Sequence, residues 1–325
     1  MDLKQERSAG KKPHICVVGE MLLEFLPADE NVLFQTFGPM YKSPSGAACI
    51  FACAAAALGA RVQLLGRTGT DPFSRFVHEV ISGYGVDTSH LIEDRERQIG
   101  LSFVEEQAGA RRFVYYRKNS AGSMLSAEDI DPAVVRQAEA LYFPAMLLGL
   151  SPQMRSACLA ALAVAREAGL ITALDLNIRQ ELWPDRDDGL LKKVISQLNL
   201  LTLNQNEAFL ITGEMDAKAA LSRLLSYGPL VVAITRGADG LIIGAEDELV
   251  EVSGLPVQVV DTVGAGDICA AGLLTGLLEG MSLEEAGRFA NATAALKIGR
   301  MGAIGRGIPT RAEVQDFLAR HYGKP

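Results

Sequence analysis

The stretch VDTVGAGDICAAG, from Val260 to Gly272, places a glycine-rich turn and an aspartate ahead of a run of small residues. A dinucleotide-binding fingerprint needs G-x-G-x-x-G, but Cys269 occupies the position of the third glycine. A Walker A loop needs a lysine directly after its last glycine, and none follows here. The two most common glycine-rich phosphate motifs are therefore excluded for this stretch.

The same residues are typical of a tight turn that leads into the N-terminus of a helix. Free backbone N–H groups and the helix dipole favour an anion there. Asp267 would lie in the first helical turn, where an acid serves as a cap. A carboxylate beside an anion hole is also what phosphoryl transfer to a hydroxyl requires, because the acid accepts the hydroxyl proton. The residues of the turn leave both roles open.

Outward from this turn, short apolar runs alternate with helical segments. Strands are expected at residues 14–18, 61–65, 170–174, 198–203 and 230–234. Helices are expected at residues 47–58, 71–84, 151–168, 189–197, 266–280, 282–298 and 310–321. This alternation predicts the α/β class, with a parallel sheet covered by helices on both faces.

Two β-rich runs, 99–105 and 111–118, break the alternation. They are separated by a short turn and predict an antiparallel hairpin. Aromatic residues alternate between the two faces of its second strand, so both faces need cover. A small sheet over a cleft would supply that cover, and the runs 20–25 and 32–37 are expected to join it.

The composition is that of an ordinary globular protein. Of the 325 residues, 49% are hydrophobic and 22% are charged. A net charge of -8 gives no basic footprint for nucleic acid. The five cysteines form no C-x-x-C, and the longest apolar stretch is too short to span a membrane. We expect a cytoplasmic protein with a disordered leader, residues 1–13, and a single domain, residues 14–325.

The stretch DTVGAGDICAAG resembles the C-terminal signature of the PfkB, or ribokinase-like, carbohydrate kinases. The similarity covers nearly the whole chain, from Val17 to the region of Leu318. It implies a ribokinase-like three-layer α/β sandwich with a mostly parallel central sheet and a small β-sheet lid, formed by segments about 20–44 and 97–119. It also implies ATP and Mg²⁺ as cofactors and a homodimer through the lid, and leaves a requirement for a monovalent cation open.

Within the signature, the resemblance implies Asp267 as the catalytic base. Gly264, Ala265 and Gly266 are implied as the anion hole for the transferred phosphoryl group. The resemblance therefore favours the catalytic role of Asp267 over a capping role.

Two further motifs resemble the nucleotide site of the family. In LTLNQNEA, Asn204 and Glu207 match an N-x-x-E element, which assigns Asn204 to the phosphates and Glu207 to Mg²⁺. The alternative for this pair is a helix cap with an acid in the first turn. Thr235, Gly237 and Gly240 resemble a nucleotide-binding T-x-G-x-x-G. Asn291 resembles an asparagine near the adenine, although a buried polar helix residue fits it equally well.

On the substrate side, VYYRKNSAGSML and LDLNIRQELW look most like 2-keto-3-deoxygluconate kinases. The counterparts of Tyr115, Arg117 and Arg179 bind the sugar acid there, and the planar fork of arginine suits a carboxylate. Two alternatives stay open. Arg179 belongs to a D-x-N-x-R element shared with fructokinases, which bind no carboxylate, so it could instead stabilise the phosphoryl group or the loop. Arg117 could be a solvated strand residue.

The sequence departs from the family at the start of the first long helix. Family members usually carry G-G-x-x-x-N, but here Gly46 is followed by Ile50 in the place of the asparagine. An apolar side chain cannot bond a sugar hydroxyl. Ser102 also stands where a tyrosine is expected in a close 2-keto-3-deoxygluconate kinase. Glu24 occupies the place of a sugar-binding acid in ribokinases; it could compensate, or it could face water from the lid.

The sequence thus predicts an ATP-dependent kinase that phosphorylates a primary hydroxyl of a small sugar or sugar acid. The leading substrate is 2-keto-3-deoxygluconate, and fructose, another sugar or a nucleoside is the alternative. An idle sugar- or nucleotide-binding protein is the alternative of another class. The substitution at Ile50 motivates the idle binder, and the intact Asp267 argues against it.

Overall fold

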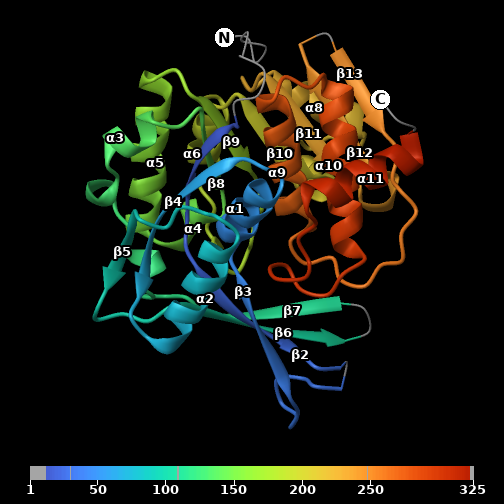
Figure 1. Ribbon diagram of the computed structural model, residues 1–325. Coiled ribbons are helices and arrows are strands. Elements are labelled where there is room, and N and C mark those ends of the chain that lie inside the picture. The colour runs from blue at the N-terminus through green and yellow to red at the C-terminus, as the bar shows by residue number, and fades with distance from the viewer. Residues whose placement is uncertain (1–11, 30, 108–109, 247, 323–325) are drawn as a thin grey trace.

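The computed structural model describes residues 12–29, 31–107, 110–246 and 248–322. It contains a nine-stranded sheet between two layers of helices and a separate four-stranded sheet (Figure 1). The predicted α/β sandwich with a mostly parallel central sheet is confirmed. Most of the predicted leader, residues 1–11, lies outside the described residues.

In the large sheet, the carboxyl ends of the parallel strands lie on the same side. Its strands are β1 (His14–Val18), β4 (Arg61–Gly69), β5 (Leu91–Asp94), β8 (Ala140–Pro144), β9 (Ile171–Asp175), β10 (Leu200–Asn204), β11 (Val231–Thr235), β12 (Leu241–Ala245) and β13 (Glu248–Val252). The order is β13-β12-β11-β10-β9-β8-β1-β4-β5, and only the pairings that involve β12 are antiparallel. The strand order reverses between β1 and β8, and ligands bind beyond the carboxyl ends of strands at such a switch point.

Helices cover both faces because every strand at the centre of the sheet is apolar on both sides. In β1, Ile15 and Val17 join one core while Cys16 and Val18 join the other. The first face is covered by α1 (Ala47–Ala57), α2 (Pro72–Gly83), α9 (Ala265–Leu278) and α10 (Leu283–Ile298). The second is covered by α3 (Pro132–Arg136), α5 (Pro152–Glu167), α6 (Asp188–Ile195), α7 (Gln205–Thr212) and α8 (Ala217–Leu225).

The remaining helical segments lie outside these two layers or connect their elements. The helix α11 (Arg311–Tyr322) packs on α10 through Phe317. The short helical turns are α4 (Leu147–Leu150), η1 (Gly122–Met124), η2 (Ala127–Asp129) and η3 (Gly237–Asp239). No helix in the described ranges has both the length and the apolar character of a membrane span.

The small sheet contains β2 (Leu22–Pro27), β3 (Met40–Ser45), β6 (Gly100–Gln107) and β7 (Ala110–Tyr116), in the order β3-β2-β6-β7. The predicted hairpin is confirmed as the antiparallel pair β6 and β7. The strand expected at residues 32–37 is wrong, because this segment is a loop closed by the Thr36 side chain, which donates to the Asn31 carbonyl. The edge strand is β3 instead, where Pro44 is tolerated.

The two faces of β7 differ in their surroundings. Phe113, Tyr115 and Arg117 line a cavity beneath the sheet. On the opposite face Val114 and Tyr116 are 38% and 66% exposed. Within this single chain the cover expected on both faces is therefore present on one face only. A homodimer through the exposed face stays a prediction.

Candidate active site

A cavity of about 400 Å³ lies between the carboxyl ends of the large-sheet strands and the small sheet. The predicted site residues that line it are Glu24, Gly46, Tyr115, Arg117, Arg179, Asn204, Glu207, Thr235, Gly264, Ala265, Gly266 and Asp267. The predicted residues Gly237, Gly240 and Asn291 lie outside this lining. The structure therefore brings the predicted catalytic, substrate and metal residues together and leaves part of the predicted nucleotide set apart.

The turn before α9 requires glycine at one position and leaves another open to the cavity. Gly264, the N-cap of α9, has a left-handed φ of 77°. A Cβ atom there would lie 3.1 Å from both Ile50 Cγ2 and Ala303 Cβ, so a side chain would be crowded as well as strained at this φ. A Cβ atom on Gly266 would meet no heavy atom within 4 Å. The N-terminus of α9 thus faces free space, as an anion site requires.

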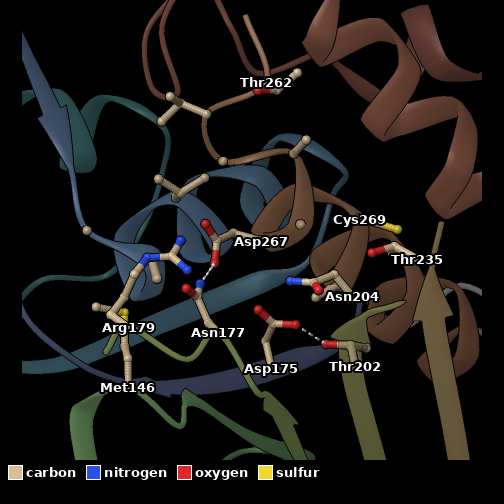
Figure 2. Close-up of a pocket in the computed structure, with 18 of the residues that line it drawn as sticks. Met146, Asp175, Asn177, Arg179, Thr202, Asn204, Thr235, Thr262, Asp267 and Cys269 are labelled. Carbon is tan, nitrogen blue, oxygen red and sulfur yellow. Dashed lines mark hydrogen bonds between the residues drawn. The ribbon is translucent and has the colours of Figure 1, made fainter. Parts of the chain in front are cut away.

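Asp267 is buried at this N-terminus, with 6% of its surface exposed. Figure 2 shows the Asn177 amide pointing at its carboxylate, and Asn177 Nδ2 donates to Asp267 Oδ1 at 3.0 Å. Burial raises the pKa of Asp267 to about 7, against the opposing effects of the Arg179 charge and the Asn177 hydrogen bond. A carboxylate with this pKa is suited to accept a proton near neutral pH.

Asp175, the last residue of β9, and Thr202, in the middle of β10, add a second polar pair beside Asp267. Thr202 Oγ1 donates to Asp175 Oδ1 at 2.7 Å (Figure 2). Burial raises the pKa of Asp175 well above its usual value, and the charges of Glu207 and Asp267 add to that effect. Several carboxylates thus share one wall of the cavity, and a hard divalent cation would offset their charge.

Asn204 and Glu207 form a reciprocal cap at the start of α7. Asn204 Oδ1 accepts from the Glu207 N–H at 3.0 Å, and Glu207 Oε2 accepts from the Asn204 N–H at 2.9 Å. Glu207 Oε1 accepts from the Ile178 N–H at 2.7 Å. The helix-cap alternative is therefore present in the structure. Both residues also line the cavity, and the Mg²⁺ role of Glu207 stays a prediction.

The predicted nucleotide turn follows the end of β11. Gly237 and Gly240 have positive φ values of 59° and 85°, as a tight glycine turn requires. Asn291, on α10, is 8% exposed and its Nδ2 donates to the Ser253 carbonyl at 2.8 Å. Asn291 thus has the contacts of a buried polar helix residue, and its adenine role stays a prediction.

Arg117 forms a buried ion pair that no sequence motif indicated. Arg117 is 3% exposed and donates through Nη2 to Glu20 Oε1, and Glu20 is 1% exposed. Its guanidinium also lies 5.3 Å from the centre of the Tyr115 ring. The alternative of a solvated strand residue is therefore wrong. Because Arg117 and Glu20 are 97 residues apart, only the folded chain shows that the arginine has an acidic partner.

Glu24 faces the cavity rather than water, which removes the alternative that it is a solvated lid residue. It is 4% exposed, and Ser102 Oγ donates to its Oε1 at 3.0 Å. Burial raises the pKa of Glu24 to about 7, although the Ser102 hydrogen bond opposes this. The small Ser102, where a tyrosine was expected, thus provides a hydroxyl partner for Glu24.

Comparison with known proteins assigns the chain to a family. A model described as "pfkB family carbohydrate kinase" matches residues 12–311. The chain belongs to the pfkB family. A fructokinase of Oryza sativa subsp. japonica is 31% identical to this pfkB chain over 321 residues, which cover 95% of the chain and 99% of that relative.

Solved structures of pfkB kinases share the fold over nearly the whole chain. A fructokinase from Xylella fastidiosa with bound ATP has a TM-score of 0.86 at 25% identity, covering 96% of this chain and 100% of that chain. A fructokinase from Vibrio cholerae O395, bound to fructose, ADP and a calcium ion, has a TM-score of 0.83 at 26% identity, covering 94% and 99%.

These relatives define the activity at a coarse level. The pfkB chain is a sugar kinase that binds ATP and transfers a phosphoryl group to an alcohol acceptor. The expected closer similarity to 2-keto-3-deoxygluconate kinases finds no support, because these similar proteins are named fructokinases.

Proposed function

We propose that the protein transfers the γ-phosphoryl group of ATP to a primary hydroxyl of a neutral keto sugar, with fructose as the first candidate. The observation that carries the transfer is the position of Asp267. Its buried carboxylate lies in the first turn of α9, next to Gly266, which opens to the cavity. An acid and a helix N-terminus at one point are the two groups that phosphoryl transfer to a hydroxyl needs.

The residues around Asp267 each have a role in the proposed reaction. Asp267 accepts the proton of the attacking hydroxyl, and the Asn177 amide orients its carboxylate. The N-terminus of α9 stabilises the charge of the transferred group. Mg²⁺ bound with ATP would neutralise phosphate charge, and Glu207 and Asn204 are the residues that would lie nearest to it.

The charges beneath the small sheet favour a neutral sugar. Arg117 already has an acidic partner in Glu20, so the pair has no net charge to offer a carboxylate. Glu24 adds an acidic group to the same cavity. Glu24 is instead placed to accept a hydrogen bond from a sugar hydroxyl, as ketohexoses provide. The fructokinase relatives support the same choice.

One observation favours a sugar acid as the second candidate. Among the described residues, no carboxylate lies within ion-pair distance of Arg179, which lines the cavity near Tyr115. The Arg179 guanidinium, whose Nη1 donates to the Ile178 carbonyl at 3.1 Å, could pair with a substrate carboxylate such as that of 2-keto-3-deoxygluconate. With a neutral sugar as substrate, Arg179 would instead stabilise the transferred phosphoryl group.

An ADP-release assay across fructose, 2-keto-3-deoxygluconate, aldoses and nucleosides tests this proposal. We expect the highest kcat/KM with fructose. A higher value with 2-keto-3-deoxygluconate would replace the neutral sugar by the sugar acid. Tight binding of one compound without turnover of any would instead support the idle binding protein.

The pH dependence of the reaction provides a second test. Asp267 has a pKa of about 7, so it is protonated and inactive as a base at lower pH. We expect kcat/KM to rise by about tenfold per pH unit below pH 7 and to level off above it. Since the pKa of Glu24 is also about 7, the same profile is measured in Glu24→Gln. If the rise of kcat/KM below pH 7 disappears in Glu24→Gln, the titrating group is Glu24 and not Asp267.

A further inference from the structure

A buried lysine contacts Asp261, the first residue of the segment 261–266 before Asp267, called the catalytic turn below. Lys297, in the last turn of α10, has a side chain with 0% exposure. Its Nζ lies 2.8 Å from the Asp261 carbonyl oxygen, 3.2 Å from the Arg300 carbonyl oxygen and 3.4 Å from Asp261 Oδ2. Three oxygens thus surround an ammonium group that has three donors.

Asp261 joins several segments at this point. Its Oδ1 accepts from the Val263 N–H at 3.0 Å and from Arg111 Nη1 of the small sheet at 2.8 Å. Its Oδ2 accepts from the Gly302 N–H at 2.9 Å. The carboxylate therefore links the turn before α9 to the loop after α10 and to β7.

The loop after α10 packs directly on the catalytic turn. Ala303 Cβ lies 3.1 Å from the place of a Cβ atom on Gly264, the N-cap of α9. A shift of residues 300–303 would therefore move the N-terminus of α9, which is proposed to bind the phosphoryl group. Lys297 holds this loop and Asp261 together from one buried position.

The contribution of Lys297 to stability does not explain why a cation is buried at this position. Burial of an ammonium group costs several kcal/mol, and an apolar residue of similar size would avoid that cost. Burial accordingly lowers the pKa of Lys297, although Asp261 opposes this. Backbone carbonyls together with a carboxylate are also oxygens that can replace the hydration shell of a monovalent cation such as K⁺.

We propose that Lys297 is a positioning residue whose tethered ammonium takes the place of a dissociable monovalent cation and holds the catalytic turn against residues 300–303. The inference rests on the proposed kinase function and adds that the enzyme needs no monovalent cation at this position. The family resemblance left open whether a monovalent cation is required. At the oxygens of Asp261 and Arg300 such a cation would find no vacant site, because the Lys297 ammonium already occupies it.

The unmodified protein gives the first test. With tetramethylammonium chloride as the background salt, we expect kcat to be the same with and without added KCl or NH₄Cl. Activation by K⁺ in the wild-type protein would overturn the proposal, because a separate cation site would then control the catalytic turn.

Two variants test the charge itself. Lys297→Met keeps the length of the side chain without the charge, and we expect kcat to fall by about tenfold with little change in either KM, as a misplaced catalytic group does. Lys297→Ala leaves space at the oxygens, and we expect NH₄⁺ or K⁺ to restore part of its kcat. Lys193→Met, at an exposed position of α6, is the matched control and should behave as the wild type. Wild-type kcat in Lys297→Met, or no response of Lys297→Ala to either ion, would overturn the proposal.

Thermal unfolding separates this inference from the proposed function. We expect K⁺ or NH₄⁺ to raise the Tm of Lys297→Ala relative to tetramethylammonium, and to leave the Tm of the wild type unchanged. This result does not depend on any sugar. Absence of turnover with every sugar would refute the kinase proposal, whereas equal Tm values of Lys297→Ala in all salts would refute the cation role.

Discussion

Replacement of Asp267 by asparagine should lower kcat with the preferred sugar by about 10²–10⁴-fold. Asparagine has the same shape, and its carbonyl can still accept the hydrogen bond from Asn177. It cannot take up the proton of the attacking hydroxyl at neutral pH. The expected result is therefore a loss in kcat with the fold and the ATP site retained.

The measurement combines steady-state ADP release with calorimetric titration of ATP. Asp185→Asn is the matched control, because Asp185 is exposed in the loop before α6 and the same substitution there should leave kcat unchanged. Turnover of Asp267→Asn at the wild-type rate would exclude Asp267 as the base. Loss of ATP binding together with turnover would show that Asp267 acts in binding and not in proton transfer.

A valine at Gly266 should reduce kcat/KM for ATP by about 10²–10³-fold, the loss seen when an anion-hole contact is removed. The side chain would project into the free space in front of α9, where no heavy atom lies within 4 Å of the added Cβ. Its Cβ would therefore enter the proposed place of the phosphoryl group without a close contact to other elements. We expect the Tm of Gly266→Val to remain within a few degrees of the wild type.

Gly264→Ala is the matched comparison, since it adds a smaller side chain two residues earlier. Its φ of 77° costs about 1–2 kcal/mol for a residue other than glycine, and its Cβ would press on Ile50 and Ala303. We expect a lower Tm as well as lower activity. Kinetics and thermal unfolding of both variants check the pair. A large drop in Tm for Gly266→Val, with none for Gly264→Ala, would contradict the assigned geometry of the turn.

The fold could be predicted from local patterns to a large extent. The apolar run of β1, the hairpin of β6 and β7 and the long helices have periodicities that depend on neighbouring residues only. The error at residues 32–37 has a local cause that the pattern does not show. There the Thr36 side chain bonds to the backbone and closes a turn, and β3 begins after Pro39.

The candidate site was predictable where one motif carries the chemistry. The glycines and the acid of residues 261–267 lie within a single turn, so their spacing alone sets their relation to one another and to the helix that follows. The proposed roles of Asp267 and of the glycine turn therefore rest on the sequence and its resemblance to a family.

Only the tertiary structure decided what the charged residues of the cavity can do. In the cavity, Arg117 has the partner Glu20 and Glu24 has Ser102; outside its lining, the buried Lys297 has Asp261. Each pair joins segments far apart in the chain. A sequence motif specifies which charged group is present. The net charge that a ligand meets also depends on the other buried groups next to that residue, and the packing of strands and helices determines which groups these are.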